Sequence, residues 1–177
     1  MRTVVLGPPP PELAALIARR HVLGLDRYDE VWDGEYHMAP MAHSSHGWLD
    51  DQVAVLLHPL IVAAGLFGTS AFNLGSPDDF RVPDRGIHRT RPHAVCLSTA
   101  AIVVEIESPD DETWEKLPFY AGRGVDEVVI VSAVRRSVTW LQFEDGSYVG
   151  PDSSALLGAG AASLADRIDW PDMDIVS

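Results

Sequence analysis

Two acidic residues interrupt the most apolar segment of the chain and are the first candidates for chemistry. Residues 100–106 form a nearly continuous apolar run, with Glu105 near its end and Glu107 just beyond it. Such a run predicts a strand buried on both faces, and side chains two positions apart on a strand share a face. A buried carboxylate is costly unless it is paired or binds a metal. The alternative is that the strand emerges into solvent at Glu107, which leaves only Glu105 partly buried.

A third carboxylate and a lysine complete a constellation suited to phosphodiester hydrolysis. Asp84 follows Val82-Pro83 near a predicted strand end, upstream of Glu105. Oxygen ligands from Asp84 and Glu105 suit Mg²⁺ or Mn²⁺, and a water bound to that cation could attack a phosphodiester. Lys116 would supply positive charge near the developing phosphate charge, because a helix after the Glu105 strand can return to that strand's end. The alternative for Lys116 is a solvated surface lysine.

The elements that must position these residues indicate an α/β protein. Asp33-Gly34 lies between two alternating runs and predicts the tight turn of a β-hairpin. Ser44 or Ser45 can cap a long helix, which Pro59 should kink or end. The apolar strand described above is expected to be central. Further strands are predicted at residues 66–74, 80–87, 127–131 and 137–143, and helices at 12–20, 110–121 and, weakly, within 155–168.

The length of 177 residues fits one domain. We expect residues 1–22 to be an N-terminal extension with a short helix and residues 23–177 to form the domain. The lone Cys96 cannot make an internal disulfide, and no apolar run approaches the roughly 20 residues that span a membrane. These features predict a cytoplasmic protein without a membrane partner.

The net charge of −13 argues against nucleic-acid binding, which gains affinity when Lys and Arg neutralise phosphates. Arg81, Arg85, Arg89 and Arg91 fall within eleven residues and could form a small basic patch on the acidic body.

Several motifs in a fixed order resemble those of a known family. They are Tyr28-Asp29-Glu30-Val31-Trp32-Asp33-Gly34-Glu35, His46, Val82-Pro83-Asp84, residues 103–109, Lys116 and residues 120–125. Their order and spacing resemble the Uma-two family of restriction endonucleases, within the PD-(D/E)XK nuclease superfamily. The resemblance implies a restriction-endonuclease-like fold, in which helices flank a mixed central sheet.

The resemblance also implies roles for individual residues. Asp84 and Glu105 would be metal ligands, and Lys116 would be the positive group. Glu107 stands where the nuclease signature usually has lysine, so either Lys116 replaces that lysine from the helix or the site is impaired. Glu35 resembles the family's upstream acid and would complete the metal shell or orient a water. His46 would contact substrate or carry a proton, unless it only caps or packs a helix.

We therefore expect an endonuclease that hydrolyses DNA with Mg²⁺ or Mn²⁺. A homodimer is expected, because cutting two strands commonly uses two sites. The alternative is a catalytically impaired nuclease-fold protein that acts as a binding or assembly module, which the net charge and Glu107 favour.

Overall fold

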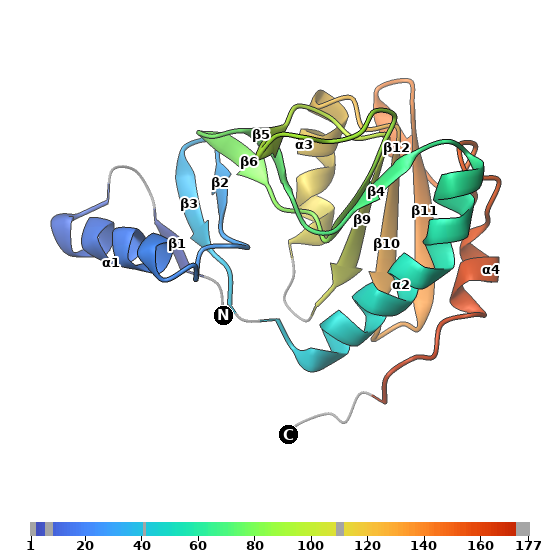
Figure 1. Ribbon diagram of the computed structural model, residues 1–177, viewed down its shortest axis with the longest axis horizontal. Helices are drawn as coiled ribbons and strands as arrows, with labels where there is room; N and C mark the ends of the chain where they lie inside the picture. Colours follow the sequence, from blue (N-terminus) through green and yellow to red (C-terminus); the bar gives the residue numbers. More distant parts are fainter. Residues whose placement is uncertain (1–2, 6–8, 41, 109–111, 173–177) are drawn as a thin grey trace.

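The computed structural model describes residues 3–5, 9–40, 42–108 and 112–172 (Figure 1). The helical elements are α1 Pro11–Val22, α2 Ser44–Ala63, the 3-10 turn η1 Thr113–Lys116, α3 Leu117–Gly122 and α4 Ala161–Ala165. The strands are β1 Thr3–Val5, β2 Glu30–Trp32, β3 Glu35–Met38, β4 Phe67–Thr69, β5 Asn73–Ser76, β6 Asp79–Arg81, β7 Arg85–His88, β8 Cys96–Leu97, β9 Ile102–Glu107, β10 Glu127–Ser132, β11 Ser137–Glu144 and β12 Ser147–Val149.

The larger part of the core lies around one mixed sheet with the strand order β12-β11-β10-β9-β7-β4. Strands β9 and β10 are parallel, and the other neighbours in this sheet are antiparallel. A parallel pair needs a crossover connection, which η1 and α3 provide. The predicted central strand is confirmed as β9, in which every residue is buried except the half-buried Glu107.

Helices cover both faces of this sheet (Figure 1). Residues of α2 and α4 pack with Val104, Ile106 and Trp140 on one face. On the other face, Val103 packs with Tyr120 of α3 and Leu74 of β5. Glu105 shares the face of Val103, because side chains alternate along a strand, and so it points toward α3.

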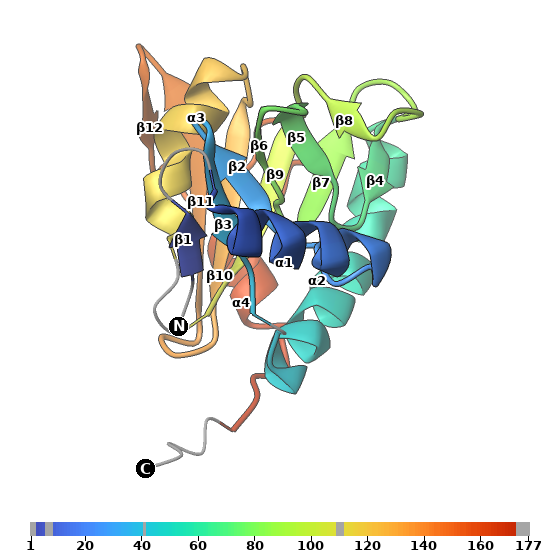
Figure 2. The same cartoon turned by 90° about the vertical axis from the view of Figure 1, so that its left-hand side faces the viewer.

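A second mixed sheet has the strand order β1-β3-β2-β6-β5-β8 and faces the viewer in Figure 2. The predicted hairpin is confirmed as β2 and β3. Asp33 (φ 51°) and Gly34 (φ 86°) form its turn, in which two positive φ values match the twist of the strands. The α/β class with mixed sheets is thus confirmed, although the strands divide between two sheets.

One long hairpin joins the two sheets, and this overturns two strand predictions. Residues 66–74 and 80–87 are each interrupted: β4 pairs with β7 in the first sheet, and β5 pairs with β6 in the second. The register is the same in both halves, since Phe67 faces His88 and Ser76 faces Asp79. Pro83 cannot donate to a ladder, and the Val82 N–H donates to Glu30 Oε1 instead of to a strand. The hairpin therefore bends just before Asp84.

The helices differ from the predictions at their ends. Helix α2 continues through Pro59 to Ala63. Pro59 has no N–H to donate to the Val55 carbonyl, but both residues face solvent, so the lost hydrogen bond lies on the exposed side of the helix. His43, not Ser44 or Ser45, caps this helix by accepting the Ser45 N–H. The helix predicted at 110–121 begins with η1, and its first residues, Asp110 and Asp111, lie outside the described residues. The weak helix within 155–168 is reduced to α4.

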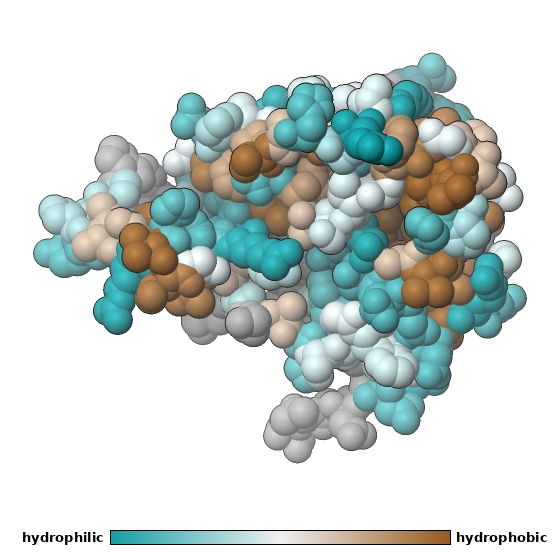
Figure 3. All heavy atoms as spheres, viewed as in Figure 1, coloured by the Kyte–Doolittle hydropathy of each residue, from teal (hydrophilic) through white to brown (hydrophobic). Residues whose placement is uncertain are grey.

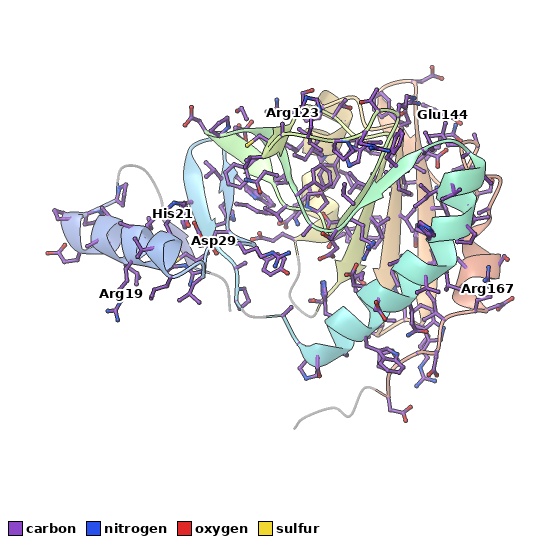
Figure 4. The ribbon with its side chains drawn as sticks, in the orientation of Figure 1. Arg19, His21, Asp29, Arg123, Glu144 and Arg167 are labelled. Carbon is purple, nitrogen blue, oxygen red and sulfur yellow. The ribbon has the colours of Figure 1, made fainter. Side chains whose placement is uncertain are left out.

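The N-terminal helix α1 projects from the body (Figures 1 and 2) and buries none of its residues. Asp29 attaches it: both carboxylate oxygens accept from Arg20, and Tyr36 and the Ala39 N–H donate to the same group. Figure 4 shows Asp29 between the helix and the hairpin, with Arg19 pointing outward. Apolar patches remain near α1 and at the C-terminal half of α2 (Figure 3). No helix among the described residues is long and apolar enough to cross a membrane.

A buried carboxylate fixes the segment that leads into α4. Glu127, at the start of β10, is 1% exposed and accepts hydrogen bonds from Trp140 Nε1, Ser154 Oγ and the backbone N–H groups of Ala155 and Leu156. All four donors lose their partner if this side chain is removed.

We therefore expect Glu127→Ala to lower the free energy of unfolding by roughly 2 to 4 kcal/mol, because the donors of the buried Trp140 and Ser154 are left unsatisfied, at about 1 to 3 kcal/mol each and not additively. Urea unfolding followed by tryptophan fluorescence measures this change. The exposed Glu144 on β11 (Figure 4) provides the control, since Glu144→Ala should stay within about 0.5 kcal/mol of the parent. Equal effects of the two substitutions would contradict this account of Glu127.

Candidate active site

Asp84, which directly precedes β7, lies beside Glu105 of β9. Strands β7 and β9 pair with Arg85 facing Val104, so the same register extended by one residue places Asp84 opposite Glu105. The Ile106 N–H donates to Asp84 Oδ2 at 2.7 Å, which fixes the Asp84 carboxylate against β9. The hairpin bend and the central strand therefore bring together the two acids that the sequence singled out.

The crossover after β9 brings a lysine and a tyrosine to Glu105. Lys116 Nζ lies 3.2 Å from Glu105 Oε1, and the Tyr120 hydroxyl donates to the same oxygen. Lys116 is only 6% exposed, so it is not the solvated surface lysine of the alternative interpretation. It is also the one lysine in the whole sequence.

A fourth charged residue, Glu30, was missed in the sequence. It is 1% exposed on β2, and its Oε1 lies 3.0 Å from Lys116 Nζ. The Val82 N–H donates to the same oxygen, and Trp32 Nε1 donates to Oε2. Two adjacent acids, Asp29 and Glu30, at the start of an otherwise apolar strand were the available signal, since both are buried here.

Glu35, the predicted upstream acid, lies farther from this cluster. It begins β3 beside the hairpin turn, where it pairs with Trp32 and is half-buried. The hydrogen bonds and ion pairs found among the described residues of the cluster involve Glu30 and not Glu35. Glu30 is thus the hairpin acid that contacts Lys116.

His46 stands on the open side of the cluster, in the first turn of α2. Its Nε2 lies 2.8 Å from Asp84 Oδ1, and its Nδ1 lies 3.3 Å from Ser108 Oγ. The side chains of His46 and Asp84 are 18% and 17% exposed, whereas Glu30, Glu105 and Lys116 are almost fully buried. A ligand from solvent therefore meets Asp84 and His46 first.

Glu107 takes part in a separate set of contacts. Trp114 Nε1 donates to its Oε1, and Arg135 pairs with its Oε2 at 2.8 Å. Partial burial alone would raise the pKa of Glu107, but hydrogen bonds from Ser132 and Trp114 and the charge of Arg135 outweigh it and lower that pKa. Glu107 is therefore an ionised, paired carboxylate next to the cluster.

Burial dominates the electrostatics of Glu105. Loss of hydration raises its pKa from 4.5 to about 8; Lys116 and Tyr120 oppose this rise, whereas the negative charges of Asp84 and Glu30 add to it. The same surroundings raise the pKa of Tyr120, so its hydroxyl stays a donor. A carboxyl that holds its proton in this way gains from a nearby cation.

The donor set of the cluster fits a hard divalent cation. Asp84, Glu105, Glu30 and Lys116 have a formal net charge of −2 when all are ionised, and the carboxylates offer only oxygen ligands. Mg²⁺ is commonly held by one or two carboxylates with waters and substrate oxygens. Within the described residues no group of three or more His, Cys, Asp or Glu is arranged around one metal position, so a closed zinc-type site is not formed there.

The expected basic patch is not present, because acids neutralise most of its arginines. Arg81 is buried and pairs with Asp79, Arg85 pairs with Asp50 at 2.7 Å, and Arg89 pairs with Asp126 at 2.6 Å. Arg91 lies over the ring of Phe67. Proximity along the chain was a poor guide here, since the bent hairpin directs these side chains to different neighbours.

Comparisons with known proteins bear on the fold and the family of this chain. A crystal structure described as "a putative nuclease belonging to DUF820", from Anabaena variabilis, superposes with a TM-score of 0.64 at 14% sequence identity, covering 78% of this chain and 90% of that one. That likeness shows the fold alone. A comparison with curated proteins gave no match. The family profile described as "Uma2: Putative restriction endonuclease" matches residues 24–159, which is most of the chain. The chain therefore belongs to the Uma2 family.

Proposed function

We propose that this protein is an endonuclease that hydrolyses DNA with Mg²⁺ or Mn²⁺ bound at Asp84 and Glu105. The observation that carries the proposal is that Asp84, which directly precedes β7, lies against β9 at Glu105, beside the buried Lys116. Membership of the Uma2 family supports it. A divalent cation would polarise the scissile phosphate and make a bound water more acidic.

The other residues have separate tasks in this proposal. Lys116 places a fixed positive charge beside Glu105, where it would stabilise the charge that develops on the phosphate. Tyr120 donates to Glu105 and orients its carboxylate. His46 lies on the solvent side of Asp84 and would contact the phosphate or carry a proton. Glu35, at the outer end of the hairpin, would orient a water molecule that enters together with the substrate.

The proposed substrate is DNA, and the proposed active form is a homodimer. The N-terminus of the 20-residue helix α2 lies beside the carboxyl end of β9 (Figure 1), and helix N-termini favour phosphate. Two copies would supply one site for each strand.

Cleavage of supercoiled plasmid tests the proposal directly. With Mg²⁺ or Mn²⁺ the protein should nick or cut the plasmid, whereas Asp84→Asn, Glu105→Gln and Lys116→Met should each lower the rate by about 100-fold or more, since each removes a charge at the reacting centre. Arg167→Ala, which changes an exposed side chain far from the site (Figure 4), should leave the rate unchanged. Equal cleavage by all these proteins would refute the assigned site.

The same experiment separates the enzyme from the alternative binding module. If the folded protein cleaves neither DNA nor RNA and calorimetry detects no divalent cation at millimolar concentration, the proposed activity is wrong. The net charge of −13 then favours a partner-binding role.

The raised pKa of Glu105 predicts a pH-dependent affinity for the cation. Below about pH 8 the carboxyl keeps its proton in the metal-free protein, and Mg²⁺ must displace that proton. The dissociation constant for Mg²⁺ should therefore fall by about tenfold for each pH unit from 6 to 8 and level off above. Calorimetry in buffers with different ionisation enthalpies measures both the affinity and the released proton. Glu105→Gln should abolish proton release, and unchanged release from that variant would disprove the assignment to Glu105.

The same group predicts how stability depends on pH without metal. The unfolded chain loses this proton near the ordinary pKa of 4.5, whereas the folded protein keeps it to about 8. This group therefore lowers the free energy of unfolding as pH rises between these values, and the decline ends above them. Urea titrations from pH 5 to 9 should show a steeper decline for the parent protein than for Glu105→Gln. Parallel curves would contradict it.

A further inference from the structure

We propose that Glu30 is the positioning residue that holds Lys116 in the site when a divalent cation takes the charge of Glu105. This inference deepens the proposed function and rests on it for the role of the cation.

Among the described residues, Lys116 pairs with two carboxylates, which have different roles in the proposed site. Its Nζ lies 3.0 Å from Glu30 Oε1 and 3.2 Å from Glu105 Oε1, and all three side chains are 7% exposed or less. Glu105 lies opposite Asp84, where the cation would bind, so its charge is shared with that cation. Glu30 approaches Lys116 from the other sheet and is not one of the two proposed ligands.

Glu30 is itself fixed before it meets the lysine. The Val82 N–H donates to Oε1 at 2.8 Å, and Trp32 Nε1 donates to Oε2 at 2.7 Å. Each carboxylate oxygen thus has its own donor, which sets the plane of the group and directs Oε1 at Lys116. Val82 belongs to the hairpin bend that ends at Asp84, so the same contact ties the lysine position to the proposed ligand.

Glu30 is needed because the cation and the Lys116 ammonium repel each other. A cation bound at Asp84 and Glu105 would repel the nearby ammonium of Lys116, and a buried ammonium without a carboxylate is strongly disfavoured. Glu30 offsets that repulsion and leaves the cluster neutral with one divalent cation. Without Glu30, Lys116 would be held less firmly once the cation is bound.

The single lysine allows a test that does not depend on cleavage or on metal. At about pH 9, where the Glu105 carboxyl has lost its proton, Glu105→Gln keeps the shape of the side chain and removes its charge, as a bound cation would. Acylation of Lys116 by an amine reagent, followed by peptide mass spectrometry, should then proceed within about threefold of the parent rate, because a charged hydrogen bond to Glu30 remains. In Glu30→Gln/Glu105→Gln the rate should rise by about tenfold or more, since both of these charged partners are lost.

The single cysteine supplies the control for general loosening. Cys96 lies on β8, away from the lysine, and its reaction with a thiol reagent reports opening of the fold. Its rate should be similar in all the variants. If Glu105→Gln alone exposes Lys116 as much as the double variant does, or if Cys96 reactivity rises in parallel with that of Lys116, the inference is overturned.

A second set of experiments measures the acylation of Lys116 in the presence of Mg²⁺ and the kinetics of DNA cleavage. In Glu30→Gln, Mg²⁺ should raise the acylation rate of Lys116, whereas in the parent it should not. Glu30→Gln should lower kcat with little change in KM, and it should cause no further loss in the Lys116→Met background. A further loss in that background would show that Glu30 acts without Lys116. Absence of all cleavage by the parent would refute the proposed function, whereas the metal-free acylation result would still decide the role of Glu30.

Discussion

The burial of Lys116 between two glutamates is the constraint on which the site depends. A buried ammonium needs carboxylate partners, and a buried carboxylate needs donors or a cation. Glu30 satisfies these needs through Val82, Trp32 and Lys116, whereas Glu105 retains an elevated pKa despite Lys116 and Tyr120. Glu105 is therefore the member of the cluster that gains most from an added positive charge.

The bent hairpin β4–β7 is what makes this arrangement possible. Its base pairs with β9 in one sheet, and its tip pairs with β2 and β8 in the other. Asp84 follows the bend and faces Glu105, whereas Val82 precedes it and binds Glu30. One proline-containing tripeptide thus connects acids from both sheets, and a straight strand through these residues would separate them.

The sequence revealed the parts of the site that follow from local pattern. The apolar run around Glu105 predicted its buried strand, and the crossover after that strand predicted the return of Lys116 to its end. Glu30 and Glu35 were harder to distinguish, because both belong to the same hairpin and only the pairing of β2 with β6 brings Glu30 inward. Such a long-range pairing leaves no periodic signal in a short strand. The predicted strands are interrupted at residues 70–72 and 82–84, where the hairpin passes from one sheet to the other. The sequence did not indicate this, because the alternation of apolar residues continues across the two sheets.

The acidity of the chain bears on the order in which its ligands would bind. Most arginines of the body already neutralise an acid, as Arg85 does with Asp50 and Arg135 with Glu107, so phosphate contacts there would replace existing ion pairs. Among the described residues, those that lie outside the ion pairs found here are Arg19, Arg27, Arg91 and Arg167. Little affinity for DNA can then come from displaced counterions. Under the proposed function, a divalent cation would first cancel the net charge of −2 at the cluster, and only then would a phosphate meet a site that attracts it.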